Sequence, residues 1–465
     1  MLKDVYFKKL LYPIISMKLK KTAEFLFIII FISFSSYAGL EKKKKSNRPN
    51  IILIMADDLG YGSLSCYGSP TINTPNLDMM AKEGMRFTDF HSNGAVCSPT
   101  RAALVTGKYQ QRVGIEGVVT AKSHRDVGLA IEELTIADAM KKEGYVTGMI
   151  GKWHLGYPER FNPVHHGFDE FIGYVSGNVD YHSHVDQEAY EDWWFQNKLQ
   201  KEEGYSTDLI TKHSVEFIKK HKDENFFLYI PHESPHGPFQ GRKSKPIRTI
   251  GEKSMKYPKE NIPAIYKEMI EVMDEGIGEV IETLKALKLT ENTLVFFCSD
   301  NGPARQGSSG GLHGNKGSVW EGGHRVPAIA WWPGKIKSGQ ESDQTVMTMD
   351  LFPTMISLVG GDKIPDWDGV DVSKVLFKGK PLAKRELFWR HYSNDGKNES
   401  AAVRRGDWKL IRLGSQAEPQ LYNLKEDLAE KTDVSSENTL LKEDLLQSLR
   451  DWENEVTQGV QRVSP

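Results

Sequence analysis

The stretch Pro49-Asn50-Ile51-Ile52-Leu53-Ile54-Met55 decides the fold class of this 465-residue chain. It is a short apolar run rich in β-branched residues, which is typical of a strand buried on both faces. The run ends at once in Ala56-Asp57-Asp58-Leu59-Gly60. An apolar strand that passes directly into acidic residues indicates a sheet whose functional groups gather at the carboxyl ends of its strands.

Two later stretches have the same form. The run at 293–299 ends in Asp300-Asn301-Gly302, and the run at 226–230 leads into Pro231-His232-Glu233-Ser234-Pro235-His236-Gly237. Strands that alternate with helices predict an α/β domain with a mostly parallel central sheet flanked by helices. The helical patterns between these runs lie at 131–142, 207–220 and 265–287.

The pattern of apolar and polar residues changes near residue 376. Short, partly alternating runs at 386–390 and 408–412 are separated by glycine and asparagine turns, and a charged helical pattern follows at about 440–455. This pattern predicts a small C-terminal α+β subdomain with an antiparallel sheet. The expected division is a catalytic domain over residues 48–375 and a subdomain over residues 376–465.

The N-terminal segment has the order of a secretory signal. Lysines at 18, 20 and 21 precede the apolar run 25–34, and Ser35-Ser36-Tyr37-Ala38 follows. The run is shorter than the roughly 20 residues of a membrane-spanning helix. We expect a signal peptide over residues 1–38, with Met17 as an alternative start, and a linker over 39–47. An uncleaved anchor is the alternative; cleavage predicts a bacterial periplasmic or extracellular protein without stable membrane insertion.

Charge and cysteine content exclude several classes of protein. The 60 Lys and Arg residues nearly balance the 62 Asp and Glu residues. No net field therefore draws the chain to nucleic acid, and no nucleic-acid partner is expected. Cysteines occur only at 66, 97 and 298, which is neither a disulfide framework nor a zinc-site spacing.

The acidic strand ends suggest a cation site. Asp57 and Asp58 follow one predicted strand, and Asp300 and Asn301 follow another. Carboxylates brought together in this way repel one another unless a cation joins them, and oxygen donors suit a hard ion. We expect Ca²⁺ in preference to Mg²⁺. Each pair taken alone is equally explained by helix capping or turn formation, but the two pairs together favour the cation.

A second motif is Cys97-Ser98-Pro99-Thr100-Arg101. Proline is accepted in the first turn of a helix, so Cys97 is expected at or just before a helix N-terminus, where free N–H groups stabilise negative charge. From the residues alone, this predicts a thiol of low pKa beside Arg101. The alternative is a buried cysteine that acts as a small apolar residue.

The Cys-x-Pro-x-Arg pattern, followed by Thr106-Gly107-Lys108, resembles the type I, formylglycine-dependent sulfatase family of the alkaline-phosphatase-like superfamily. Further blocks occur in the order of that family, over roughly residues 48–335. The closing run Tyr422-Asn423-Leu424 also resembles the family's C-terminal subdomain. The further blocks are Asp57-Asp58, Gly151-Lys152-Trp153-His154-Leu155-Gly156, Pro235-His236-Gly237-Pro238-Phe239, Asp300-Asn301-Gly302, Gly314-Asn315-Lys316-Gly317 and Trp320-Glu321-Gly322-Gly323.

The resemblance implies a nucleophile and a metal site. A separate maturation enzyme would oxidise Cys97 to formylglycine (3-oxoalanine), and one hydroxyl of the hydrated aldehyde would attack sulfur. A divalent cation would neutralise the sulfate oxygens and lower the pKa of the nucleophile. The implied metal ligands are Asp57, Asp58, the residue at position 97, Asp300 and Asn301.

The resemblance also implies roles for five further residues. Lys152 and Lys316 would place positive charge where the sulfuryl group spreads its negative charge. Arg101 would hold the hydrate in place. His236 would protonate the leaving alcohol, and His154 would be the base that lets the second hydroxyl expel sulfate.

The substrate is expected to be a sulfated oligo- or polysaccharide rather than an aryl or steroid sulfate. The segment Gly177-Asn178-Val179-Asp180-Tyr181-His182-Ser183-His184 resembles a loop of sulfatases that act on galactosamine-containing glycans. Trp193 and Trp194 add flat aromatic faces that suit sugar rings, although core packing is the alternative for each tryptophan. The candidate substrate contacts are Asp180, His182, His184, Trp389 and Arg390.

Two other functions stay open at this stage. A phosphonate monoester hydrolase or phosphodiesterase of the same superfamily could use the same core residues, because phosphoryl and sulfuryl groups have similar size and geometry. A glycan-binding protein without activity would result if Cys97 were never oxidised. All ten core positions are present, which favours an active enzyme.

Overall fold

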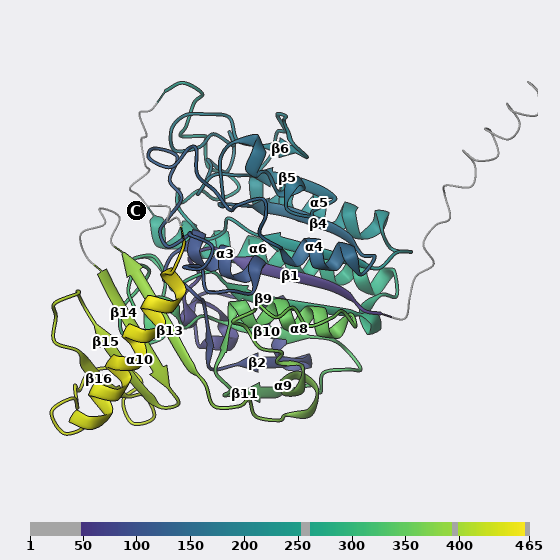
Figure 1. Ribbon diagram of the computed structural model, residues 1–465. Helices are drawn as coiled ribbons and strands as arrows, with labels where there is room; N and C mark the ends of the chain where they lie inside the picture. The colour runs from purple at the N-terminus through teal and green to yellow at the C-terminus, as the bar shows by residue number, and fades with distance from the viewer. Residues whose placement is uncertain (1–47, 253–260, 393–398, 461–465) are drawn as a thin grey trace, which may run out of the picture. The chain divides into compact units, whose positions relative to one another are not determined.

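A computed structural model describes residues 48–252, 261–392 and 399–460 of the chain. Its centre is a ten-stranded sheet (Figure 1). The strands are β1 (Asn50–Ala56), β2 (Met85–Phe87), β4 (Val146–Lys152), β5 (Glu170–Tyr174), β6 (Trp194–Phe195), β7 (Lys198–Leu199), β8 (Phe226–Pro231), β9 (Thr293–Ser299), β10 (Ala328–Trp331) and β11 (Gln340–Ser342).

The strand order of this sheet is β11-β2-β10-β9-β1-β8-β4-β5-β6-β7. The five central strands from β9 to β5 are parallel, and antiparallel pairs join β10 to β9 and β6 to β5. The three apolar runs of the sequence form the adjacent strands β8, β1 and β9. Register pairs Met55 with both Pro231 and Cys298, so these three strands end at the same edge.

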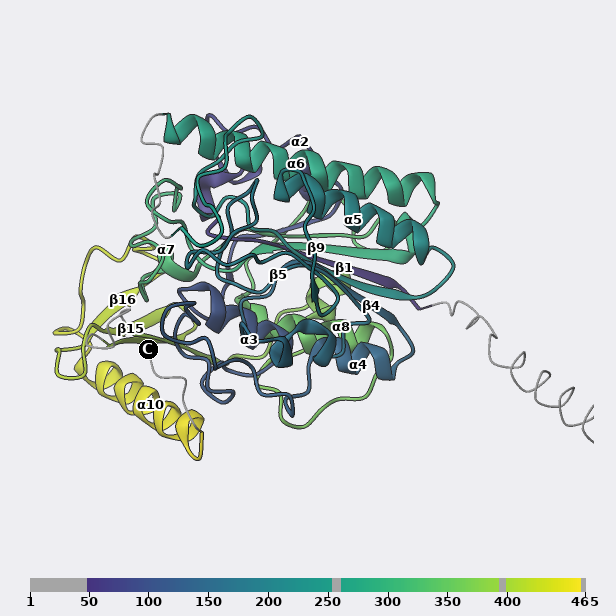
Figure 2. The same ribbon diagram turned by 90° about the horizontal axis from the view of Figure 1, so that it is seen from above.

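Helices cover both faces of the sheet. Alternate residues of β1 point to opposite faces, so that Ile51 and Leu53 belong to one hydrophobic core and Ile52 and Ile54 to the other. In Figure 2, α2, α5 and α6 cover one face and α3, α4 and α8 the other. The helices are α2 (Pro75–Glu83), α3 (Cys97–Thr106), α4 (Ile136–Lys142), α5 (Ser206–Lys220), α6 (Ile262–Ala286), α7 (Glu321–His324), α8 (Leu351–Leu358) and α9 (Ser373–Lys378).

A four-stranded antiparallel sheet in the order β13-β14-β15-β16 follows, with one helix packed on it. It lies beside the carboxyl ends of the central strands (Figure 1). The predicted α/β fold with a small C-terminal antiparallel sheet is confirmed. Helix α9 crosses the expected boundary at 375/376, and the division into domains stays a prediction. The elements are β13 (Glu386–Tyr392), β14 (Glu399–Arg405), β15 (Trp408–Arg412), β16 (Gln420–Asn423) and α10 (Thr439–Thr457).

The predicted helix at 131–142 is shorter in the structure, where α4 begins at Ile136. Thr135 caps it: its hydroxyl accepts from the Asp138 N–H (3.2 Å), and the Asp138 carboxylate accepts from the Thr135 N–H (3.1 Å). This reciprocal capping box ends the preceding turn and starts the helix. The apolar spacing alone does not reveal that boundary.

Two further predictions concern the N-terminal segment and the cysteines. The predicted signal peptide and linker, over residues 1–47, lie outside the described residues. In the described part of the chain, no helix combines the length and the apolar character needed to cross a membrane. All three cysteines are described and none forms a disulfide, as their number and spacing predicted.

An alanine substitution at Gly151 tests how tightly the central strands pack. Its φ is +130°, and an added Cβ would lie 2.0 Å from the Pro231 carbonyl oxygen at the end of β8. Gly68 is a control with positive φ (+95°) and no atom within 4 Å of an added Cβ. We expect Gly68→Ala to lower the free energy of unfolding by about 1–3 kcal/mol through backbone strain. We expect Gly151→Ala to cost about 1–3 kcal/mol more through overpacking. Urea unfolding checks this, and equal losses would contradict it.

Candidate active site

Acidic and amide side chains from neighbouring strands meet at one edge of the sheet. Asp57 and Asp58 follow β1, Asp300 and Asn301 follow β9, and all four are buried. The Asp58 N–H donates to the Asp300 carboxylate (3.1 Å), and the Asn301 amide donates to the Asp58 carboxylate (2.7 Å). The structure thus brings together the two acidic strand ends that the sequence singled out.

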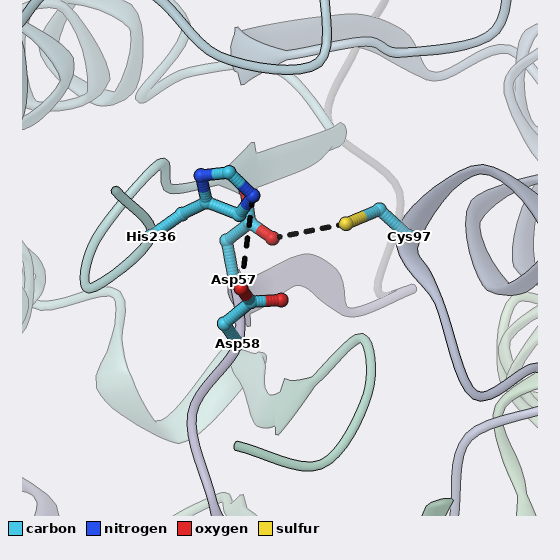
Figure 3. Close-up of side chains that lie close together, drawn as sticks. All are labelled: Asp57, Asp58, Cys97 and His236. Atoms are coloured by element: carbon cyan, nitrogen blue, oxygen red, sulfur yellow. Dashed lines mark hydrogen bonds and ion pairs between the residues drawn. The ribbon is translucent and has the colours of Figure 1, made fainter. Parts of the chain in front are cut away.

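Cys97 faces this cluster from the first residue of α3. Its Sγ lies 3.3 Å from the Asp57 carboxylate and 3.3 Å from the Lys316 ammonium. Figure 3 shows the thiol pointing toward Asp57, with His236 and Asp58 on the other side of the cluster. The predicted place of Cys97, at a helix N-terminus, agrees with the structure.

The thiol itself is not activated. Burial raises the pKa of Cys97, and the negative charges of Asp300 and Asp57 raise it further, against the opposing effect of Lys152 and Lys316. The low-pKa thiol predicted from the motif is therefore wrong, because desolvation and two carboxylates outweigh the helix N-terminus and the lysines. In this environment the sulfur is a poor nucleophile.

Each carboxylate of the cluster has a cationic partner. Arg101 also donates to the Lys152 carbonyl (3.1 Å), so its guanidinium joins α3 to the end of β4, and its predicted role in holding the hydrate stays a prediction. All three cations come from different elements: α3, β4 and the loop after β9. The pairs are Lys152 Nζ with Asp57 at 2.5 Å, Lys316 Nζ with Asp58 at 2.6 Å, and Arg101 Nη2 with Asp300 at 2.8 Å.

The carboxylates are not equally neutralised. Burial favours a raised pKa for Asp58, but Lys316 and His236 outweigh it and hold that pKa well below its usual range. Asp300 shows the opposite shift, because burial and the charge of Asp57 raise its pKa to about 6. The neutralisation of the cluster is therefore uneven, and Asp300 is the carboxylate whose ionised form is least favoured.

The donor set fits a hard cation. The side-chain oxygen of Asn301 is buried and lacks a hydrogen-bond partner among the described atoms. Ligand atoms of Asp57, Asp58, Cys97 and His236 all lie within 4.8 Å of one another. Carboxylate and amide oxygens are the ligands that Ca²⁺ and Mg²⁺ take in proteins, and an ion there would use the orphaned Asn301 oxygen.

His236 lies on the loop after β8. Its Nδ1–H donates to the Gly237 carbonyl (2.5 Å), which leaves Nε2 facing the Asp58 carboxylate at 3.6 Å (Figure 3). Burial lowers the pKa of His236 to about 3, and Lys316 and Lys152 lower it against the opposing charge of Asp58. The ring is therefore neutral until a negative charge enters the site.

His154 follows β4 and has a left-handed backbone, with φ at +61°, as does Asp58 at +63°. Such strained positions cluster at functional sites. The His154 Nε2–H donates to the Val119 carbonyl (3.1 Å), and Nδ1 is buried without a partner. Burial, Lys152 and Arg101 hold the pKa of His154 well below its usual range, so the ring is neutral and its Nδ1 lone pair has no hydrogen-bond partner.

Two predicted substrate contacts lie in the interior instead. Trp389 is 1% exposed, donates from its indole to the Ser92 carbonyl and stacks on His324. Arg390 is 6% exposed and forms an ion pair with Glu116. Neither side chain can present a face to a sugar, so for Trp389 the core alternative is correct. The contacts that bury them are long-range and leave no local signal in the sequence.

The predicted glycan loop lies next to His236. The Tyr181 hydroxyl donates to the His236 carbonyl (2.8 Å). Asp180 is fully buried and accepts backbone N–H groups from 182, 183, 247 and 248, so it shapes the loop. His182 and His184 line a pocket of about 420 Å³ together with Trp193. Trp194 is half-buried on β6.

Sequence reasoning missed a buried charged group behind the loop that carries Lys316. Glu321, Lys409 and Glu430 form it, and all three are at most 2% exposed. Lys409 is the only one in a predicted strand, and its partners are far away in the sequence. Lys409, which lies between Trp408 and the apolar pair Leu410-Ile411 of a predicted strand, is the one signal that could have drawn attention to this group.

The fold and the site together define a hydrolase that accepts a tetrahedral anionic ester. A carboxylate cluster with paired lysines adjoins the residue at position 97, and the ligand atoms of Asp57, Asp58 and His236 lie within 4.8 Å of its sulfur. The chain belongs to the sulfatase family, whose model matches residues 49–361. The model "N-sulphoglucosamine sulphohydrolase, C-terminal" matches residues 311–455. The chain is thus a sulfuric ester hydrolase, as its motifs predicted.

Known relatives agree with this assignment. Human N-acetylgalactosamine-6-sulfatase is 35% identical over 370 residues, which cover 73% of this chain and 68% of that protein. Human arylsulfatase A is 35% identical over 398 residues, with 78% and 74% covered. Among solved structures, Ps i-CgsB in complex with k-i-k-neocarrahexaose has a TM-score of 0.80 at 29% identity and covers 90% of this chain and 95% of its own.

Arg101 provides a test of the charge balance in this cluster. Arg101→Lys keeps the charge but loses the forked contact with Asp300, so we expect a loss of about 2 kcal/mol in the free energy of unfolding. Arg101→Met leaves Asp300 without its partner and is expected to cost about 3–5 kcal/mol. Urea unfolding of both variants measures this. A Met variant as stable as the Lys variant would show that Asp300 does not depend on the guanidinium.

Proposed function

We propose that the chain removes sulfate from a sulfated carbohydrate, with formylglycine at position 97 and Ca²⁺ in the carboxylate cluster. The observation that carries the proposal is the state of Cys97. Its thiol sits where a nucleophile is needed, yet burial and two carboxylates raise its pKa. A thiol in this state is a poor nucleophile, and oxidation of the residue by a separate maturation enzyme would supply a better one.

Formylglycine at position 97 and the cation would supply complementary chemistry. The hydrated aldehyde supplies one hydroxyl as the nucleophile and a second whose deprotonation expels sulfate. A cation bound by Asp57, Asp58, Asp300, Asn301 and position 97 supplies positive charge that stabilises the sulfate oxygens. Ca²⁺ is favoured over Mg²⁺ because it accepts irregular sets of carboxylate and amide oxygens more readily.

The chain's own residues hold charge and move protons. Lys316 lies 3.3 Å from the sulfur at position 97, and Lys152 pairs with Asp57. Both would stabilise the sulfuryl group as its charge spreads. A bound sulfate ester brings negative charge beside His236, which raises the pKa of that ring and lets it protonate the leaving alcohol. His154 is neutral and has a free Nδ1. It would accept the proton of the second hydroxyl as that group expels sulfate. Arg101 keeps Asp300 oriented.

A carbohydrate is the proposed substrate because of the loop that adjoins His236. His182 and His184 line the pocket beside it, and its polar groups suit the hydroxyls of a sugar ring. Trp193, which is 1% exposed and stacked on His184, supports the pocket from behind. The named activity of the relative N-acetylgalactosamine-6-sulfatase and the k-i-k-neocarrahexaose bound to the structural neighbour agree with this class. Export of the chain, which the N-terminal pattern predicts, would bring it to sulfated polysaccharides outside the cell.

Turnover of an aryl sulfate and of the matching aryl phosphonate tests the reaction class. We expect the protein from its native host to hydrolyse the sulfate ester with the higher kcat/KM, and Cys97→Ala to abolish turnover because the precursor of the nucleophile is gone. Preference for the phosphonate would replace the proposal with the phosphonate hydrolase alternative.

Peptide mass spectrometry on the same preparation provides the control. An aldehyde at position 97 is expected. Unmodified Cys97 in every peptide, together with no turnover, would instead support a glycan-binding protein without activity.

His182 tests the sugar site. His182→Ala is expected to lower kcat/KM for a defined sulfated oligosaccharide about tenfold, the equivalent of about 1.4 kcal/mol of binding, and to leave kcat/KM for a small aryl sulfate unchanged. His165→Ala is the matched control, because His165 pairs with Glu159 on the surface away from this pocket. Equal losses on both substrates would place the effect of His182 on His236 and not on the sugar.

A further inference from the structure

The loop that carries Lys316, residues 313–322, is closed at its base. The Gly322 N–H donates to the His313 carbonyl (2.7 Å), and the rings of His313 and Trp320 stack with centroids 4.0 Å apart. We call this segment the Lys316 loop. Because its two ends are held together, any displacement of the base moves the whole loop, including Lys316 at its tip.

The tip of the Lys316 loop reaches the reacting position. The Lys316 N–H donates to the Pro303 carbonyl (3.0 Å), and the Gly317 N–H donates to the Ala95 carbonyl (2.8 Å), two residues before Cys97. The Lys316 ammonium then lies 3.3 Å from Cys97 Sγ. The loop therefore sets how far this positive charge stands from the nucleophile.

Residues of the C-terminal part of the chain bind the base of the Lys316 loop through ion pairs and hydrogen bonds. Lys409, from β15, lies 2.9 Å from the Glu321 carboxylate and 2.8 Å from that of Glu430. Glu430 also accepts the Glu321 N–H (2.7 Å), and its carbonyl lies 3.3 Å from His313 Nδ1. The two C-terminal residues thus hold both ends of the loop.

This buried group also touches a set of residues that could hold a metal. His91, Glu321 and His324 bring ligand atoms within 4.8 Å of one another. The Lys409 ammonium lies 3.1 Å from His324 Nε2 and is already paired with Glu321. A cationic side chain fills the place that a metal ion would take, so this group is a structural clamp.

We propose that Lys409 and Glu430 are positioning residues for catalysis: through Glu321 they hold the Lys316 loop so that Lys316 stays beside position 97. The inference rests on the role proposed for Lys316 in stabilising the sulfuryl group. It makes the C-terminal subdomain a part of the catalytic apparatus.

The physical basis is the cost of leaving a buried charge unpaired. Glu321 and Lys409 are both fully buried, and Arg325 pairs with the other oxygen of Glu321 at 3.2 Å. Loss of Lys409 therefore leaves one buried oxygen of Glu321 without its cation and draws the carboxylate toward Arg325. The loop base moves with Glu321. A shift of about 1 Å at a charge aimed at the reacting group costs on the order of 10²-fold in rate.

A double-mutant cycle in the full, matured chain tests the proposal. Lys409→Met is expected to lower kcat for an aryl sulfate about 100-fold with little change in KM. Lys316→Ala should lower kcat as well, and adding Lys409→Met to it should cause almost no further loss, because Lys409 acts through Lys316. Arg412→Met is the matched control. Arg412 points to the other face of β15 and pairs with Glu453 on α10, so its loss should leave kcat unchanged.

Glu430 keeps the test decisive if Lys409→Met does not fold. Glu430→Ala removes the acceptor of the Glu321 N–H and should lower kcat in the same way, whereas Glu430→Gln keeps an oxygen there and should restore it. If Lys409→Met lowers kcat by the same factor with and without Lys316→Ala, the inference is overturned. It is also overturned if Lys409→Met lowers only the free energy of unfolding and leaves kcat normal. Neither result would touch the role proposed for Lys316. Full activity of Lys316→Ala would instead overturn the role proposed for Lys316.

Discussion

The constraint on which the structure depends is the burial of three carboxylates at one edge of an apolar sheet. Asp57, Asp58 and Asp300 end adjacent strands whose register is set by the packing of both sheet faces. Desolvated carboxylates so close together are tolerated only with positive charge nearby. Arg101, Lys152 and Lys316 supply this positive charge from three separate elements. The same charges make this edge of the sheet suitable for binding an anionic ester.

Because the neutralising groups come from distant segments, the fold and the active site stabilise each other. Arg101 ties the helix that begins at Cys97 to the end of β9, and Lys152 ties the end of β4 to β1. Lys316 arrives on a loop held by the C-terminal sheet through Lys409 and Glu430. Under the roles proposed for Lys316 and Lys409, the smaller sheet contributes to the position of a charge used in catalysis, although none of its residues contacts position 97 directly among the interactions described.

Much of this arrangement could be predicted from local patterns. The strands at 50–56, 226–231 and 293–299 and the helices α5, α6 and α10 lie close to where the sequence patterns predicted them. Residues near motif blocks, such as Asp58 and His154, were found where the strand ends placed them. Errors arose where nonlocal burial decided the outcome: Trp389 and Arg390 were expected at the substrate but lie in the core, and the thiol of Cys97 has a raised pKa.

The sequence by itself determined the class of fold, the family and the identity of the charged residues at the strand ends, because these follow from periodicity and from short motifs within continuous segments. Only the tertiary structure decided which cation pairs with which carboxylate, which aromatic side chains are exposed, and how Lys409 reaches Glu321. Those properties depend on distances and desolvation between residues far apart in the chain, and neither quantity is encoded in local spacing.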